Sequence, residues 1–196
     1  MTTADLSPAA AKAAFREQIR AIRRARTDAV RTQAADAIAA RALPHLAESA
    51  IVACYLSMPT EPGTAAVIEL LRKHGIRVLL PRVQDLSLDW IELGDDTTFV
   101  TSGLGVAEPV GESHPNALTD CDAIVLPALA ISAEGARLGQ GGGFYDRALE
   151  AIPTSADGGP IRIALVFDDE IFDAIPQEPH DSTVDLAITP ERVLSF

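Results

Sequence analysis

The stretch Arg137-Leu-Gly-Gln-Gly-Gly-Gly-Phe-Tyr-Asp-Arg147 places four of the chain's 13 glycines within five positions. The apolar run 123–131 precedes it and is typical of a buried strand, while residues 144–152 follow it with apolar side chains at helical spacing. The predicted order is therefore strand, glycine-rich loop, helix. Such a loop lets the backbone approach a ligand closely, and amides at a helix N-terminus favour phosphate. A flexible linker is the alternative interpretation.

Two common phosphate-binding patterns are absent from this loop. The P-loop ends in Gly-Lys-Ser/Thr, and no lysine is present here. The dinucleotide-binding pattern requires a glycine where Phe144 stands. Arg137 and Arg147 flank the loop, and Asp146 is a candidate cation ligand. The loop is therefore predicted to bind a nucleotide or phosphate in another way.

The composition bounds the class of protein. With 196 residues, 47% of them hydrophobic and 22% charged, the chain is long enough for one domain over 1–196, with an N-terminal helical segment at about 7–44. A net charge of −12 argues against a general nucleic-acid binder or a protein that binds anionic membranes. Cys54 and Cys121 are expected to be buried free thiols. No apolar run approaches the roughly 18 residues of a membrane helix, so a cytoplasmic protein is expected.

A row of basic residues marks the first predicted helix. Ser7-Pro8 is typical of a helix start, because serine is a good N-cap and proline is accepted in the first turn. Four basic residues then follow at four-residue spacing along one face: Lys12, Arg16, Arg20 and Arg24. Like charges at this spacing repel each other by about 0.2–0.5 kcal/mol per pair. The row is either an anion-binding surface or a solvated face, and the sequence leaves both open.

The next part of the chain predicts a parallel sheet. A second helix over about 28–43 leads to a continuous apolar run at 51–56, a helix over 64–74 and a strand at 76–80. This β-α-β order implies parallel strands, and ligands bind at the carboxyl ends of such strands. Glu61 and Arg82 are expected at that edge, although Glu61 is equally consistent with a helix-start residue.

The remainder completes an α/β pattern. Further strands are predicted at 88–93, 161–167 and 184–189, and residues 94–120 are expected to be loops. Trp90 is interpreted as a packing residue. The four histidines have no metal-ligand spacing, and no Ser or Cys has the context of an activated nucleophile. Asp181 is either a turn residue or a site residue.

Residues 137–146 match the pattern Arg-Leu-Gly-x-Gly-x-Gly-Tyr/Phe-Tyr-Asp, and in this the chain resembles the 5-formyltetrahydrofolate cyclo-ligase family, also called 5,10-methenyltetrahydrofolate synthetases. The resemblance extends over almost the whole chain, through shorter matches at Lys12 to Arg16, Leu56 with Glu61, 106–109, and Asp181 with Asp185. It implies a three-layer α/β fold with a mostly parallel sheet flanked by helices, similar to the sugar-phosphate isomerase and CoA-transferase group.

The resemblance also implies a reaction. It is the ATP- and Mg²⁺-dependent cyclisation of 5-formyltetrahydrofolate to 5,10-methenyltetrahydrofolate, with release of ADP and phosphate, through a phosphorylated formyl oxygen. Such an enzyme uses no protein nucleophile and is expected to be a monomer. Phosphoryl transfer of this kind requires positioning and charge neutralisation, which glycine amides, basic side chains and metal-binding carboxylates supply.

Site residues follow from the family motifs position by position. The implied ATP-binding residues are Lys12, Arg16, Arg137, Gly139, Gln140, Gly141, Gly142, Gly143, Phe144 and Tyr145. The implied folate-binding residues are Leu56, Glu61, Gln140, Gly141, Gly142, Gly143 and Phe144. The implied Mg²⁺ ligands are Asp146 and Asp181.

Three positions depart from the family pattern. Phe144 stands where many members have Tyr, Gln140 where Arg or Tyr is common, and Ser132 where many have Asp. These departures leave a non-catalytic folate- or nucleotide-binding paralogue as an alternative. A second alternative is an interaction protein whose basic helical row binds an acidic partner.

Overall fold

The computed structural model describes residues 7–103, 105–178 and 181–196. Its helices are α1 (Pro8–Ala25), α2 (Asp28–Leu46), α3 (Ala65–Lys73) and α4 (Phe144–Leu149), with 3-10 turns at Ser155–Asp157 and Asp168–Glu170. Among these described residues, no helix is long and apolar enough to cross a membrane.

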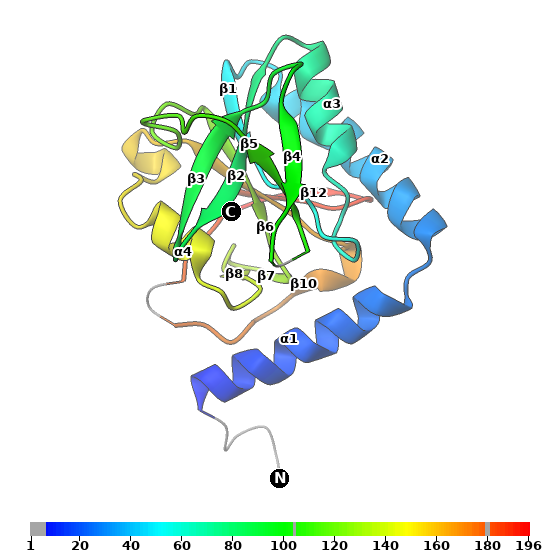
Figure 1. Cartoon of the computed structure of the whole chain (residues 1–196). Helices are drawn as coiled ribbons and strands as arrows, with labels where there is room; N and C mark the ends of the chain where they lie inside the picture. The colour runs from blue at the N-terminus through cyan, green and yellow to red at the C-terminus, as the bar shows by residue number, and fades with distance from the viewer. Residues whose placement is uncertain (1–6, 104, 179–180) are drawn as a thin grey trace.

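A seven-stranded sheet with the order β12-β11-β9-β6-β1-β2-β3 forms the centre of the molecule (Figure 1). The five inner strands are parallel, and the edge strands β12 and β3 are antiparallel to their neighbours. The strand bounds are β1 (Ile51–Cys54), β2 (Arg77–Gln84), β3 (Ser87–Glu92), β6 (Ala123–Pro127), β9 (Ile161–Leu165), β11 (Leu186–Ile188) and β12 (Val193–Ser195). The predicted α/β class with a mostly parallel sheet is confirmed.

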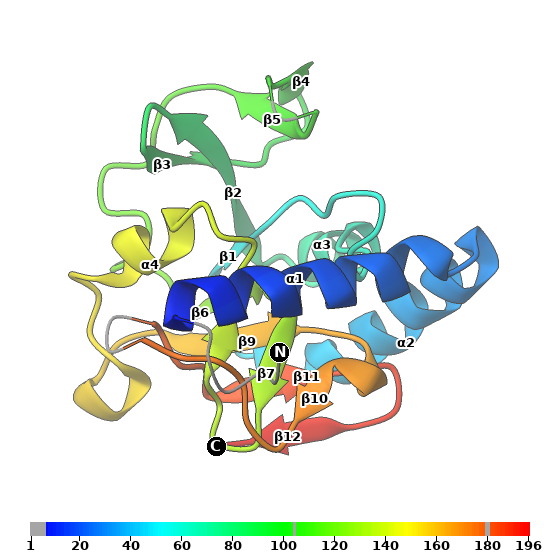
Figure 2. The same cartoon turned by 90° about the horizontal axis from the view of Figure 1, so that it is seen from below.

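Two smaller sheets accompany the central one. Beside β2 lies a hairpin of β4 (Thr98–Thr101) and β5 (Ala107–Val110). A three-stranded sheet in the order β10-β7-β8 joins β7 (Ala130–Ser132), β8 (Arg137–Leu138) and β10 (Ile171–Phe172). Figure 2 shows the hairpin next to the β2 and β3 side of the central sheet and α1 crossing in front of the sheet, and Figure 1 shows α1 at the end of the molecule near β7 and β10.

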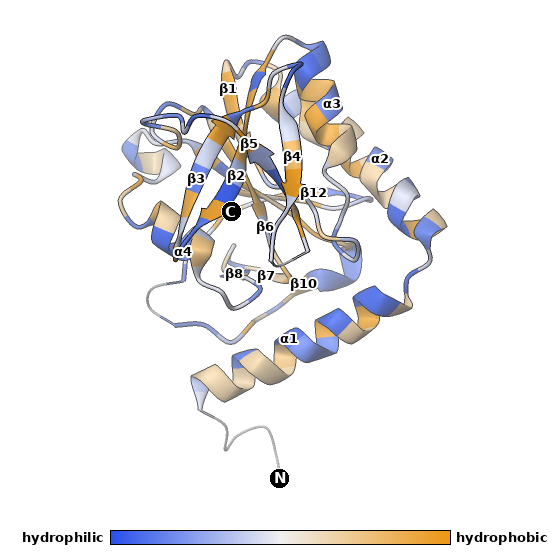
Figure 3. Ribbon diagram, in the orientation of Figure 1, coloured by the Kyte–Doolittle hydropathy of each residue, from blue (hydrophilic) through white to orange (hydrophobic). Residues whose placement is uncertain are grey.

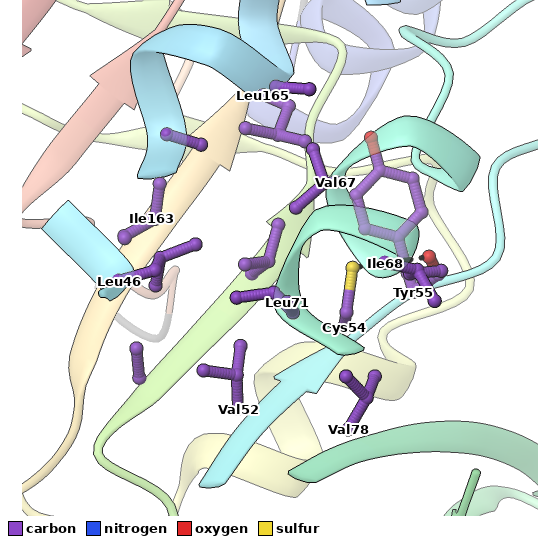
Figure 4. Close-up of a cluster of buried hydrophobic side chains, with 14 of the residues drawn as sticks. Leu46, Val52, Cys54, Tyr55, Val67, Ile68, Leu71, Val78, Ile163 and Leu165 are labelled. Carbon is purple, nitrogen blue, oxygen red and sulfur yellow. Dashed lines mark hydrogen bonds between the residues drawn. The ribbon is translucent and has the colours of Figure 1, made fainter. Parts of the chain in front are cut away.

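Alternation along the buried strands explains the layers. In β1, Val52 and Cys54 point to the face covered by α2 and α3, whereas Ile51 and Ala53 point to the opposite face. The opposite face is covered by α4 and residues 117–121. Because both faces are buried, the strands appear in the sequence as continuous apolar runs. Figure 4 shows part of the apolar cluster between the sheet and helices α2 and α3, with Leu71 of α3 above Val52.

The structure corrects the predicted strand at 123–131. It breaks after Pro127, and the chain then enters the small sheet as β7. The carbonyl oxygens of Pro127 and Ala128 accept hydrogen bonds from Arg137 and Arg23 instead of continuing a ladder. The glycine-rich loop consequently follows the short strand β8, not the long buried strand.

Three other boundaries differ from the sequence prediction. Residues 94–120 contain the β4–β5 hairpin, although its exposed strands show no buried apolar alternation. The helix after the glycine loop ends at Leu149 and is only six residues long. The second helix passes through Pro44 and ends at Leu46, whose burial favours the additional turn. The buried free thiols of Cys54 and Cys121 and the packing role of Trp90 are confirmed.

Candidate active site

A pocket of about 660 Å³ lies where the chain order of the sheet reverses, between β1 and β6. Its walls include Tyr55 and Leu56 directly after β1, Val83 near the end of β2, and Leu129 just beyond β6. These positions are the carboxyl ends of parallel strands. A switch point of this kind is where open α/β sheets bind their ligands.

The glycine-rich loop forms one wall of the pocket, with residues 139–143 followed by the first turn of α4. Gly141 and Gly143 have φ angles of 103° and 67°, which other residues rarely adopt. A Cβ atom at Gly143 would lie 2.6 Å from the Arg147 guanidinium. The amides of residues 140–143 donate no hydrogen bond to any described residue. The loop therefore presents free donors that suit an anion.

Arginine side chains of helix α1 bind backbone carbonyl groups of this loop. Arg16 Nε donates to the Gly139 oxygen at 2.9 Å, and Arg20 Nη2 donates to the Gln140 oxygen at 2.7 Å. Arg16, Arg20 and Arg24 all line the pocket. Most of the basic row therefore faces the pocket, as an anion-binding surface would. In Figure 3 hydrophilic residues recur along α1, whereas the strands of the sheet are mostly hydrophobic.

Lys12 stands at the other end of the same face and has two carboxylate partners. Its Nζ lies 2.7 Å from Glu178 Oε2 and 2.5 Å from Asp181 Oδ2. Burial lowers the pKa of this ammonium, but hydrogen bonds to Asp181 and Glu178 outweigh it, so that the pKa is raised. Asp181 lines the pocket, whereas Lys12 lies behind it and is only 3% exposed.

A second pair of opposite charges joins Arg137 to Asp146. The buried Arg137 guanidinium donates through Nη1 to the Pro127 oxygen at 3.1 Å and through Nη2 to the Asp146 carboxylate. Asp146 lies in the first turn of α4 and lines the pocket. Both predicted metal-binding carboxylates thus reach the same pocket, and each is paired with a basic residue predicted to bind ATP.

The carboxylates of Asp146 and Asp181 fit a magnesium ion that is also bound by the phosphates of a nucleotide. No group of three or more His, Cys, Asp or Glu side chains suited to a metal occurs among the described residues. Two carboxylates are too few for a closed protein cage. They are, however, the usual protein contribution where Mg²⁺ keeps waters and takes substrate phosphates as ligands.

Glu61 lies buried in the loop after β1 and contacts the glycine loop at Gln140. Its Oε1 accepts a hydrogen bond from Gln140 Nε2 at 2.8 Å, and its Oε2 accepts one from the Met58 amide at 2.9 Å. Burial raises the pKa of the Glu61 carboxyl, against the effect of these two hydrogen bonds. Gln140 Oε1 in turn accepts from Arg20 at 3.2 Å. The Gln140 side chain therefore joins the loop after β1 to α1.

The structure brings most of the predicted site residues together. Arg16, Leu56, Glu61, Arg137, residues 139–146 and Asp181 all line the one pocket. Tyr145 has a packing role as well, because its ring lies edge-on to Trp90 with centroids 6.2 Å apart. Ser132 is buried, and its hydroxyl caps a turn by accepting from the amides of Glu134 and Ala136.

Arg82 and Asp185 were also singled out in the sequence, and neither lines the pocket. Arg82 pairs with Asp89 on the neighbouring strand β3. Asp185 accepts a hydrogen bond from the Arg162 amide at 2.7 Å and so joins β9 to the segment before β11. Both have structural partners, and neither contributes to the pocket.

Sequence reasoning gave no site role to Arg20 and did not consider Arg23. Arg23 is 1% exposed and donates to both carboxylate oxygens of Glu170, at 2.8 and 2.7 Å, and to the Ala128 oxygen. Arg20 was recognisable as part of the basic row. Arg23 carried no such signal, because its partner Glu170 is 147 positions away.

The chain is similar over most of its length to one family of known proteins. Residues 8–190 match the 5-formyltetrahydrofolate cyclo-ligase family. The 5-formyltetrahydrofolate cyclo-ligase of Mycolicibacterium smegmatis is 38% identical over 148 residues, which cover 72% of this chain and 74% of that protein. The mouse protein of the same name is 30% identical over 142 residues, covering 68% of this chain and 70% of the mouse protein.

Two solved structures share the fold. The 5,10-methenyltetrahydrofolate synthetase of Aquifex aeolicus superposes with a TM-score of 0.80 at 23% identity, covering 94% of this chain and 92% of that one. The corresponding protein of Mycoplasma pneumoniae gives a TM-score of 0.70 at 21% identity, covering 91% and 98% of the two chains. At these identities the superpositions establish the architecture.

Proposed function

The chain belongs to the 5-formyltetrahydrofolate cyclo-ligase family of ATP-dependent ligases, and from this premise we propose that it makes 5,10-methenyltetrahydrofolate from 5-formyltetrahydrofolate and ATP. ADP and phosphate are the other products. The reaction depends on Mg²⁺, and the formyl oxygen carries the transferred phosphoryl group.

One observation carries this proposal: a single pocket joins a loop with free amides, a basic helix face and two carboxylates. Among the described residues that line the pocket there is no Ser, Cys or His to act as a nucleophile or as its base. Phosphoryl transfer needs neither, because its demands are alignment and neutralisation of charge. The composition of the pocket therefore favours direct transfer from ATP to the substrate.

The proposed roles of the residues combine the family motifs with the positions of the residues in and beside the pocket. Lys12, Arg16 and Arg137, with residues 139–145, hold ATP, whose phosphates match the free amides of the loop. Leu56, Glu61 and residues 140–144 hold the folate, with the buried Glu61 carboxyl as the polar group at that end of the pocket. Asp146 and Asp181 are the Mg²⁺ ligands, and the metal neutralises charge on the phosphates.

The chemistry proceeds in two steps. The N5-formyl oxygen attacks the γ-phosphorus of ATP, ADP leaves, and the formyl carbon becomes bonded to N5 and to an oxygen that carries phosphate. N10 then attacks this carbon, the carbon–oxygen bond breaks, phosphate departs with the former formyl oxygen, and N10 loses its proton. The chain's residues position the two substrates and stabilise the charges on the phosphates.

Heavy oxygen in the formyl group tests the proposal. The purified protein is incubated with ATP, Mg²⁺ and 5-formyltetrahydrofolate labelled with ¹⁸O in the formyl group. We expect near-ultraviolet absorbance of the methenyl product to rise while one labelled oxygen appears in each released phosphate. Unlabelled substrate in ¹⁸O-water is the matched control, and its phosphate stays unlabelled.

Two results would contradict parts of the proposal. Product that forms while the label appears in water would exclude the phosphorylated formyl oxygen. Absence of product, although the folded protein binds ATP or the folate, would instead favour the non-catalytic binding paralogue. The two hydrogen bonds of the Gln140 side chain, to Glu61 and from Arg20, would then be the contacts to test by substitution, because Gln140 is one of the departures from the family pattern.

A further inference from the structure

The two pairs Lys12–Asp181 and Arg137–Asp146 share one unusual arrangement. In each, a buried cation that is suited to phosphate is bound to a carboxylate that is suited to a metal. Lys12 is 3% exposed and Arg137 is 4% exposed, so neither charge is solvated by bulk water. Both carboxylates line the pocket and are partly exposed.

Buried charges of this kind depend strongly on their partners. Removing one member of a buried ion pair leaves the other charge without compensation, which is costly. A divalent cation that approached Asp181 alone would therefore have to displace the Lys12 ammonium into a site with only Glu178 left as its carboxylate. The same holds for Arg137, which would keep its hydrogen bond to the Pro127 oxygen but would have lost its carboxylate.

The phosphates of a nucleotide supply the missing partners. Two basic groups released from Asp181 and Asp146 can bind phosphate oxygens, while a divalent cation takes over both carboxylates. The exchange keeps every charge paired: two ion pairs are lost, and new pairs form between basic groups and phosphates and between metal and carboxylates. The total positive charge that faces the carboxylates stays at two.

We propose that Lys12 and Arg137 act as stand-in cations, which occupy the two carboxylates until a nucleotide arrives and so make metal binding depend on nucleotide binding. This inference rests on the proposed function, because it takes its metal ligands and ATP residues from there. It adds an order of events: the metal enters with the nucleotide and not before it. By linkage, the metal also strengthens nucleotide binding by the same factor.

Binding of Mn²⁺ in the absence of nucleotide and folate tests this directly. Free Mn²⁺ has an electron paramagnetic resonance signal that disappears on binding, so affinity can be measured without turnover. We expect the wild-type chain to bind Mn²⁺ weakly and Lys12→Met to bind it at least roughly tenfold more tightly, since the positive charge of Lys12 no longer competes for the Asp181 carboxylate. Lys12→Arg, which keeps the cation, is expected to behave like the wild type.

Three further variants make the result specific. Lys73→Met removes one positive charge from the exposed Glu69 pair on α3, and we expect it to leave Mn²⁺ affinity unchanged. Adding Asp181→Asn to Lys12→Met is expected to abolish the gain, which would assign the metal to that carboxylate. If Lys12→Met fails to fold, Arg137→Met tests the same exchange at Asp146.

The outcomes separate this inference from the proposed function. Equal Mn²⁺ affinity in folded Lys12→Met and wild-type protein would overturn it, as would an equal gain in Lys73→Met. Because neither folate nor turnover enters the measurement, an inactive protein whose Lys12→Met variant gains Mn²⁺ affinity would refute the cyclo-ligase reaction and still support the exchange.

Discussion

Helices α1 and α3 are both packed on the body of the protein, but by different chemistry. Three side chains of α1 are buried, and two of them, Lys12 and Arg23, are cations. The three buried side chains of α3 are Val67, Ile68 and Leu71, which belong to the main apolar cluster (Figure 4). The α1 interface therefore adds buried ion pairs and hydrogen bonds to carbonyl groups to a small apolar cluster around Ile19 and Phe15, whereas the α3 interface consists of apolar contacts.

The difference separates binding from folding. Apolar contacts exclude water and have no partner to exchange, so the α3 face stabilises the sheet whatever is bound. Charged contacts can change partner at little net cost when a ligand offers an equivalent charge. The α1 side of the molecule, which carries Arg16 and Arg20 against the glycine loop, is thus the side on which ligands can rearrange contacts.

The largest effect is expected from breaking the buried pair that anchors α1. Arg23→Met removes the closer of the two arginines beside the buried Glu170 carboxylate, which keeps Arg26 at 3.5 Å, and we expect the free energy of unfolding to fall by about 3–5 kcal/mol. Denaturant titration measures this loss. The double variant Arg23→Met with Glu170→Gln removes both charges and is expected to recover most of it. Unchanged stability of Arg23→Met would mean that α1 is held by other contacts.

An apolar truncation on the other helix tests the second half of the comparison. Leu71→Ala is expected to lower the free energy of unfolding by about 2–5 kcal/mol, because it opens a cavity beneath α3. Leu86→Ala, at a side chain that is 74% exposed, is the control and is expected to stay within about 0.5 kcal/mol of wild type. The folded Leu71→Ala protein should keep its kcat. A lower kcat without loss of stability would place functional residues on the α3 face.

Removing one proposed metal ligand acts on chemistry more than on folding. Asp146→Asn removes the charge that pairs with the buried Arg137 but keeps an oxygen that can accept from it, so we expect some loss of stability while the protein still folds. We expect kcat/KM to fall by roughly 10²–10³-fold, as when one stabilising group of a transition state is lost. Asp95→Asn, in an exposed pair with Arg72, is the control. Near-normal activity of Asp146→Asn across Mg²⁺ concentrations would remove Asp146 from the metal site.

The smallest predicted effect distinguishes members of the basic row. Lys12→Ala and Arg16→Ala are each expected to raise the ATP concentration required for half-maximal rate by at least roughly tenfold, given about 1.5–3 kcal/mol for a charge-assisted bond. Arg24→Ala is expected to leave it unchanged, because Arg24, although it lines the pocket, is 56% exposed and is already paired with Glu17. Steady-state kinetics with varied ATP decide this. Small and equal effects at all three positions would mean that the row is a solvated face.

Local patterns in the sequence determined the elements that carry their own signal. The apolar runs of β1 and β9 predicted strands buried on both faces, because the side chains of such a strand pack alternately against the two apolar clusters. The spacing of basic residues predicted one face of α1, since helical geometry is set locally. The glycine-rich motif indicated the family and the loop's position in the pocket, because its glycines meet a local backbone requirement at Gly141 and Gly143.

Only the tertiary structure decided which charges meet. The strand at 123–131 breaks after Pro127, where side chains from β8 and α1 bind the carbonyl groups, and the α1 partner Arg23 is 105 positions away. The pairing of Lys12 with Asp181 spans 169 positions, and that of Arg23 with Glu170 spans 147. A charged residue looks the same in a sequence whether it is solvated or buried. Its role is set by the partner that folding brings to it, and no local pattern encodes that partner.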